Sequence, residues 1–146
     1  MRGHTLMNVR FLNCSTNSIN NMFSHIRTSK ENKERVTKLT NKLNLGAENV
    51  IARIALSHSL AQVEKLDISD LKDSGGKEYS KKVLFGENID AYLGMICLRY
   101  GIHTSDIDAP KYIKMHIDDG LELLDQELQS RNNVDAFDFI CEKISN

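Results

Sequence analysis

Apolar residues recur at helical spacing over most of the chain. Val36, Leu39 and Leu43 fall on one face of a helix, and after a break at Gly46 a second helix is predicted from Ala47 to about Gln62. In the second helix the apolar residues cover nearly the whole circumference, so burial on more than one side is expected. In a chain this short, a partner subunit can bury such a helix more easily than the chain itself can. We therefore predict an oligomer.

A short strand is predicted at residues 23–27, directly ahead of these helices. Alternation along the strand places His25 and Arg27 on the same side. Thr28, with Glu31 three residues further on, is the predicted N-cap of the first helix, because the two side chains can satisfy free backbone N–H groups reciprocally.

Three further helices are predicted in the second half of the chain, near Asn88–Tyr100, from Pro110 onwards and after Asp135, beyond a turn-rich stretch at residues 67–79. Their predicted inward-facing residues are Ile89, Leu93 and Ile96, then Ile113, Ile117, Leu121 and Leu124, then Phe137, Ile140 and Ile144. The sequence therefore predicts a mainly α fold. It is a small helical domain with a ribbon-helix-helix-like N-terminal unit (a short strand plus two helices), followed by further helices.

The composition agrees with this fold class. A single proline, no tryptophan and 6% aromatic residues disfavour a β-sandwich, and 146 residues suit one compact domain. We predict a flexible N-terminal extension at residues 1–21, a helical domain at 22–128 and an acidic helical C-terminal extension at 129–146.

Neither a membrane span nor a secretory signal is expected. No apolar run reaches the roughly 18 to 20 residues that a span needs, and the start of the chain lacks an apolar region followed by a cleavage site. Cys14, Cys97 and Cys141 are too widely spaced for a metal knuckle or a disulfide framework, so we expect reduced thiols. These features favour a cytoplasmic location.

The net charge of −1 conceals an asymmetry along the chain. Residues 26–53 hold seven basic and three acidic side chains, whereas residues 115–146 hold two basic and eight acidic ones. A local basic face that binds a polyanion is therefore compatible with a weakly acidic protein.

Basic residues of the first half are the candidates for contact with DNA phosphates. The predicted DNA-binding residues are Arg27, Lys30, Lys33, Arg35, Lys38, Lys42, Lys77, Lys81 and Lys82. Such contacts are largely independent of sequence. The alternative interpretation is an ordinary solvated helix face, in which Glu31 and Glu34 pair with basic residues four positions further on.

No catalytic, metal or cofactor site is indicated by residue spacing. The turn at residues 74–77 matches a phosphate-binding loop only in part, since Leu71 and Glu78 stand where that loop needs Gly and Ser or Thr. The turn can still present backbone N–H groups and the Lys77 ammonium to a nucleic-acid phosphate, or it can be purely structural. His58, on an apolar helix face, is interpreted as a hydrogen-bonded core residue. We expect a protein without enzyme activity, metal or cofactor.

Several ordered segments resemble the DndE family of DNA sulfur-modification proteins. They are residues 45–60, which begin Leu-Gly-Ala-Glu-Asn-Val, then residues 71–79, which contain the Ser-Gly-Gly-Lys turn, then residues 84–87 and 112–121. The resemblance covers about residues 24–125, so the predicted domain at 22–128 is DndE-like and both termini fall outside it.

The resemblance implies a role in bacterial DNA phosphorothioation, in which sulfur replaces a non-bridging backbone oxygen. It implies a small helical homo-oligomer, described as a tetramer, that prefers nicked duplex DNA and works alongside DndC and DndD, while sulfur activation belongs to other subunits. The family often has a Thr-Gly-Leu-Thr-Pro-Asn-like turn where this chain has residues 44–49, and Glu48 there would weaken contact with a phosphate.

Two other functions remain open on the sequence. A ribbon-helix-helix repressor or antitoxin would read base edges with His25 and Arg27 and prefer one palindromic operator. A protein adaptor without DNA binding would instead dock a partner enzyme through the acidic C-terminal half.

Overall fold

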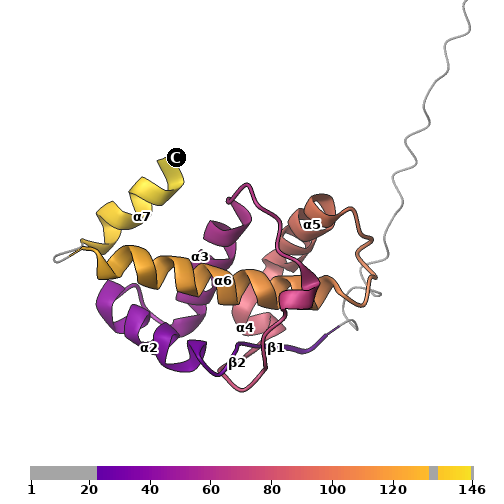
Figure 1. Cartoon of the computed structure of the whole chain (residues 1–146), viewed down its shortest axis with the longest axis horizontal. Helices are drawn as coiled ribbons and strands as arrows, with labels where there is room; N and C mark the ends of the chain where they lie inside the picture. Colours follow the sequence, from indigo (N-terminus) through magenta and orange to yellow (C-terminus); the bar gives the residue numbers. More distant parts are fainter. Residues whose placement is uncertain (1–22, 132–134, 146) are drawn as a thin grey trace, which may run out of the picture.

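The computed structural model describes residues 23–131 and 135–145, and Figure 1 shows their arrangement. In chain order the elements are β1 (His25–Arg27), α2 (Asn32–Leu43), α3 (Glu48–Leu60), β2 (Glu78–Ser80), α4 (Lys81–Phe85), α5 (Ile89–Tyr100), α6 (Ala109–Gln129) and α7 (Ala136–Ser145), with 3-10 turns at Ile68–Asp70 and Gly86–Asn88. The predicted fold class is confirmed: the chain is mainly helical and begins with a short ribbon. The predicted extension at residues 1–21 lies outside the described residues.

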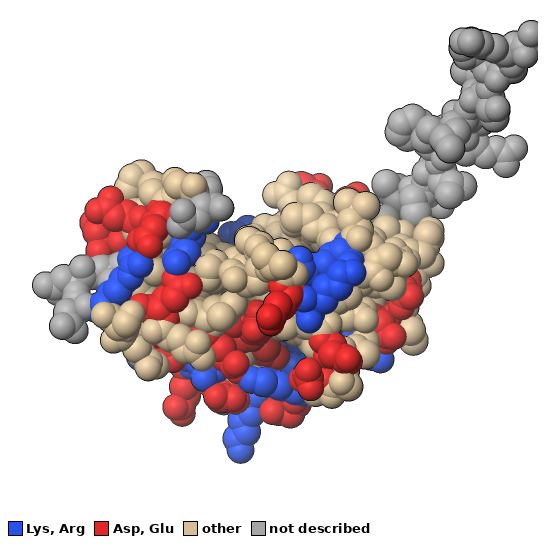
Figure 2. All heavy atoms as spheres, turned by 45° about the horizontal axis from the view of Figure 1, so that its top comes forward, with Lys and Arg blue, Asp and Glu red and all other residues tan. Residues whose placement is uncertain are grey.

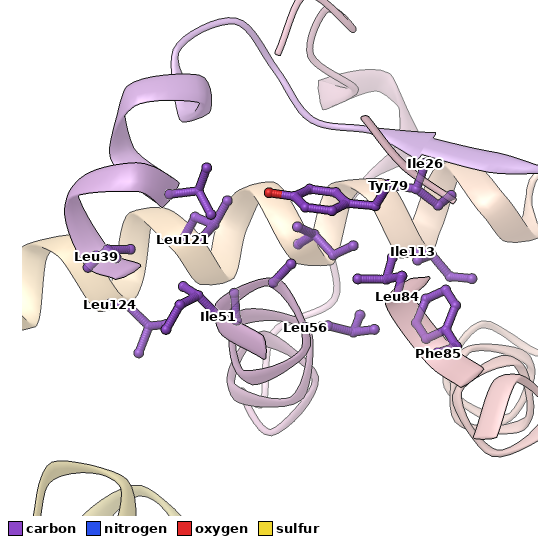
Figure 3. Close-up of a cluster of buried hydrophobic side chains, with 14 of the residues drawn as sticks. Ile26, Leu39, Ile51, Leu56, Tyr79, Leu84, Phe85, Ile113, Leu121 and Leu124 are labelled. Carbon is purple, nitrogen blue, oxygen red and sulfur yellow. The ribbon is translucent and has the colours of Figure 1, made fainter. Parts of the chain in front are cut away.

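Helix α6 runs the length of the molecule, with α2 and the ribbon on one side and α5 and α7 on the other (Figure 1). Pro110 occupies its first turn, where the missing N–H has no helical partner to lose. The four predicted inward residues of this helix are fully buried. Buried side chains from α2, α3, α4 and the ribbon gather around them in Figure 3: Leu39, Ile51, Leu56, Leu84, Phe85, Ile26 and Tyr79.

Helices α3 and α6 approach each other closely at Gly120. A Cβ atom built at this position would lie 1.9 Å from the backbone oxygen of Ala55, which is far inside van der Waals contact. Only glycine therefore fits where the two backbones cross.

The apolar surface of α3 is covered mainly by its own chain. Ile51, Ala52, Ala55 and Leu56 are buried, and α3 packs against α6, α2 and α4. A partner subunit is therefore not needed to bury this face of α3. The oligomer stays a prediction.

The ribbon is closed within the chain. β1 pairs antiparallel with β2, so that Ile26 lies opposite Tyr79 and Arg27 lies opposite Glu78. In a ribbon-helix-helix dimer the strand pairs with a second copy, so this pairing is the main departure from that pattern. Neither β2 nor α4 was predicted from the sequence, whereas the exposed positions of His25 and Arg27 on β1 confirm the predicted alternation.

The start of α2 differs from the predicted capping box. The Thr28 side chain accepts a hydrogen bond from the Lys77 N–H at 2.9 Å instead of capping the helix. Helix α2 has no side-chain cap. The N–H groups of Ser29 and Lys30, just ahead of the helix, donate to the carboxylates of Asp118 and Asp73, each at 2.9 Å. Contacts with residues so distant in the sequence are invisible to local rules.

Helix α7 is capped as predicted, but its inner face is different. The Asp135 carboxylate accepts from the N–H groups of Phe137 and Asp138. Phe139 is 1% exposed and Phe137 is 74% exposed, so Phe139, not the predicted Phe137, faces inward. The side chain of Ile144 lies outside the described residues.

None of the described helices is both long and apolar enough to cross a membrane. Cys97 and Cys141 are free thiols, as expected, and Cys14 lies outside the described residues.

Replacing Gly120 with alanine should destabilise the fold by about 3 kcal/mol or more, because the backbones of α3 and α6 must separate to admit the methyl group. The matched control is Gly94→Ala in α5, where a Cβ meets nothing within 4 Å. That change should stabilise the helix by about 0.5 to 1 kcal/mol. Urea unfolding midpoints of the two variants check both signs, and equal effects would contradict the close crossing.

Candidate nucleic-acid interface

Three of the predicted DNA-binding residues hold α2 against α6. Arg35, with its side chain 18% exposed, lies 3.4 Å from the Asp125 carboxylate, and the Lys38 ammonium lies 2.9 Å from the same group. The Lys42 ammonium donates to the Leu128 carbonyl at 2.7 Å. Burial raises the pKa of Asp125, but the hydrogen bond and charge of Lys38, with further help from Arg35, bring it below its ordinary value. Much of this basic charge is therefore compensated inside the molecule.

Two more candidates are paired on the ribbon and the turn that precedes β2. The Arg27 guanidinium binds the Glu78 carboxylate, with its Nε donating at 2.8 Å, and holds the pKa of Glu78 below its usual value. The Lys77 ammonium lies 3.4 Å from Glu48. Both pairs are partly exposed to solvent, where such contacts contribute little to stability and can be exchanged for a phosphate.

The remaining candidates have more exposed charges. Lys30, Lys33 and Lys82 are exposed, and within residues 23–131 and 135–145 none of them forms an ion pair with a carboxylate. Lys81 is half-buried, with its ammonium 5.6 Å from the centre of the Phe23 ring. Lys30, Lys33 and Lys82 are therefore the lysines best placed to gain a new anionic partner.

The structure brings Lys33, Lys38 and Lys77 to one shallow, open depression of about 350 Å³ beside the outer face of α2. Thr37 and Asn41 also line it, and Glu34 is its one acidic lining residue among those described. The sequence interpretation did not include Thr37 and Asn41. Their spacing of four and eight residues from Lys33, which places all three on one helix face, was the signal that could have found them.

The glycine turn is used structurally. A Cβ at Gly76 would lie 2.2 Å from the backbone oxygen of Ser29, so glycine is needed for the turn to pack on the ribbon. The N–H of Gly75 binds Asp73, and those of Gly76 and Lys77 bind the Thr28 carbonyl and hydroxyl. The backbone N–H groups of Gly75, Gly76 and Lys77 are thus occupied within the chain. Of the groups predicted to contact a phosphate, the Lys77 ammonium remains a candidate.

Acidic and basic side chains are interspersed over the lower part of the face in Figure 2, with no extended region of one sign. Any attraction for a polyanion on this face must come from a few local lysines. Within the described residues there is also no group of three or more His, Cys, Asp or Glu side chains that could hold a metal ion.

Comparison with known proteins decides the family. The family model described as DNA sulphur modification protein DndE matches residues 25–132. The chain belongs to the DndE family. Among solved structures, it is similar to the crystal structure of DndE from Escherichia coli B7A involved in DNA phosphorothioation modification. The identity is 20% and the TM-score 0.59, over 68% of this chain and 95% of that one. This likeness shows the shared fold. No curated protein matches the chain.

The region matched to DndE contains a buried chain of hydrogen bonds that passes through His116. The Tyr100 hydroxyl lies 2.8 Å from His116 Nε2, and the Ser59 hydroxyl lies 2.7 Å from Nδ1. Ser59 also donates to the Asp119 carboxylate at 2.5 Å, and Tyr100 accepts from the Leu66 N–H. One set of proton positions satisfies all of these contacts: a neutral His116 donates from Nδ1 to Ser59 and accepts at Nε2 from Tyr100.

This cluster combines Ser, His and Asp, a set that the residue spacing did not reveal. The Ser59 hydroxyl is directed at Asp119 and the residue is 1% exposed, so the arrangement joins α3, α5 and α6 and leaves the hydroxyl closed to a substrate. His58 on α3 is confirmed as a hydrogen-bonded histidine, with Nε2 3.1 Å from the Glu127 carboxylate.

Acidification should weaken the fold through His116. Burial is the main cause that lowers its pKa from 6.5 to about 4, and the nearby charge of Arg99 adds to the effect. Between these values the unfolded chain binds the proton and the folded chain does not, so stability rises with pH in this window and levels off above it. The contribution of His116 should amount to about 2 kcal/mol between pH 5 and pH 7.

The measurement is urea unfolding of the wild type and of His116→Gln at pH 5, 6 and 7. The variant should lose most of the pH dependence, whereas His25→Gln, which changes an exposed histidine, should retain it. Parallel pH profiles for wild type and His116→Gln would contradict the buried neutral histidine.

Proposed function

We propose that this DndE-family chain is a non-catalytic, DNA-binding component of a bacterial DNA phosphorothioation system in the cytoplasm. It binds the sugar-phosphate backbone, with nicked duplex as the preferred form, as a homo-oligomer alongside DndC and DndD. Family membership supports the system, and the name of the E. coli structure links that protein to phosphorothioation.

The observation that carries the DNA-binding part is the depression beside α2. Lys33, Lys38 and Lys77 meet there from two segments of the chain, together with the polar side chains of Thr37 and Asn41. Ammonium, hydroxyl and amide groups are the donors that proteins use for backbone phosphates. Lys33, which forms no ion pair among the described residues, supplies attraction, and exchange of the Lys77–Glu48 ion pair for a phosphate adds to it.

The preference for nicked duplex is carried over from the resemblance to the DndE family. Bending intact duplex towards a small surface costs on the order of 1 to 6 kcal/mol. A nick interrupts one strand and lowers this cost. Oligomerisation increases the overall affinity for DNA, because the few exposed lysines of one chain are repeated in each copy along the DNA.

The alternatives fit the geometry less well. A ribbon-helix-helix reader pairs its strand with that of a second copy, whereas β1 pairs with β2 within the chain. An adaptor that docks through its acidic half needs free carboxylates, whereas four of these carboxylates already pair with basic side chains of this chain: Glu122, Asp125, Glu127 and Glu142.

The double variant Lys33→Gln/Lys77→Gln should bind duplex DNA more weakly and with a flatter salt dependence. Removing one lysine–phosphate interaction should reduce the slope of log affinity against log salt by about 0.9, so the slope should fall by about 1.8 in the double variant. Fluorescence anisotropy with one random duplex across salt concentrations measures both quantities.

The control is Lys65→Gln, which removes an exposed lysine outside the depression and should leave the slope unchanged. If the double variant matches the wild type in slope and affinity, the depression does not contact DNA.

A further inference from the structure

A second concave surface lies on the side of α3 that faces away from α2. It is a groove of about 390 Å³ between α5 and α7, with α3 as its floor. In Figure 1, α7 and α5 stand on either side of α3 in this region. Val50, Ile54 and Ala61 from α3, Tyr92 from α5 and Ile140 from α7 make most of its surface apolar. This groove is lined by none of the residues assigned to DNA binding.

Arg53 is the unusual residue of this groove. It is half-buried, and within the described residues no carboxylate or carbonyl group pairs with its guanidinium. The other cation of the lining, Lys143, already contacts Glu127. A partly desolvated guanidinium without a partner is costly, so an anionic group on an occupant would be bound favourably.

The wall formed by α7 is attached through few side chains. Phe139 is its one fully buried side chain among those described, and ion pairs of Lys143 with Glu127 and of Glu142 with Arg131 hold the helix in place. The helix also lies beyond the region matched to the DndE family. The groove is therefore a feature that this chain builds with its own C-terminal helix.

The dimensions of the groove fit a helix. Its floor runs from Val50 to Ala61, which at 1.5 Å per residue is about 16 Å, or three helical turns. An extended apolar surface flanked by a cation suits an amphipathic helix better than a compact ligand.

We propose that this groove docks an amphipathic helix of about three turns from a protein partner. The apolar stripe of that helix lies on Ile54, Tyr92 and Ile140, and an acidic side chain pairs with Arg53. The proposal rests on the proposed function, because it gives the chain separate surfaces for DNA and for the proteins of the modification machinery.

The test uses purified DndC and DndD as probes and measures their binding to the full chain by biolayer interferometry, with DNA binding measured in parallel. Ile54→Glu and Arg53→Glu should each weaken binding to a protein partner at least about tenfold and leave the salt slope on duplex DNA unchanged. Arg53→Lys, which retains the positive charge, should bind more tightly than Arg53→Glu.

Leu98→Glu is the matched control, since it places a carboxylate on an exposed apolar position outside the groove and should bind as the wild type does. Urea midpoints near that of the wild type establish that the groove variants fold. Unchanged partner binding in both groove variants overturns the proposal, as does a wild-type chain that binds DNA but neither protein.

A fall in solution mass on Ile54→Glu, with partner binding retained, would also overturn the proposal, because the groove would then hold a second copy. Failure of the DNA-binding part of the proposed function is distinguishable from all of these outcomes, since it appears as a wild-type chain that does not bind DNA.

Discussion

The backbones of α3 and α6 pass so close together that position 120 has room for no side chain at all, and the rest of the molecule is arranged around this contact. The crossing fixes α6 as a central helix with neighbours on several sides. From it, Asp118 reaches the start of α2, His116 reaches Ser59 on α3, and Asp125 reaches Arg35 and Lys38. Polar groups that would be costly to bury alone are thus satisfied in pairs or chains along one helix.

The same helix determines how the charge asymmetry of the sequence is used. The basic first half and the acidic second half meet where α2 lies on α6, and Arg35 and Lys38 are compensated there by Glu122 and Asp125. What remains for a polyanion is a short series of exposed lysines on the outer side of α2 and around β2. The proposed function therefore depends on a few local contacts and on avidity through repetition of the chain, rather than on one strongly basic face.

Much of the fold could be predicted from the sequence, because periodic apolar residues determine long helices. The inner residues of α6 are an example, since each of them is buried as the spacing predicts. The strand β2 was missed because it depends on pairing with β1, which is more than 50 residues away. Helix α4, with five residues, is too short to show a periodic apolar pattern. The contacts of Asp118 just ahead of α2 and the inward position of Phe139 also depend on tertiary contacts that local rules do not include.

For the candidate site, the sequence could indicate which residues carry charge but not which charges are already paired. Arg35, Lys38 and Lys42 form a regular basic stripe, yet Lys38 and Lys42 have partners 87 and 86 positions away, and Arg35 shares the partner of Lys38. Helical spacing alone predicts that Lys33, Thr37 and Asn41 share one helix face. The position of Lys77 beside them could not be predicted in this way, because it depends on the pairing of β1 with β2. Arg53 belongs to the helix whose apolar residues cover nearly the whole circumference, and its lack of a partner among the described residues becomes visible only when α5 and α7 are in place.

The central claim is that the chain binds the sugar-phosphate backbone of DNA and favours duplex that contains a nick. The most direct measurement is binding of the wild-type protein to nicked duplex, intact duplex and single-stranded DNA of one random sequence, across salt concentrations. The account predicts salt-sensitive binding to duplex that is tightest when the duplex is nicked. Absence of binding to all three forms at low salt would contradict it.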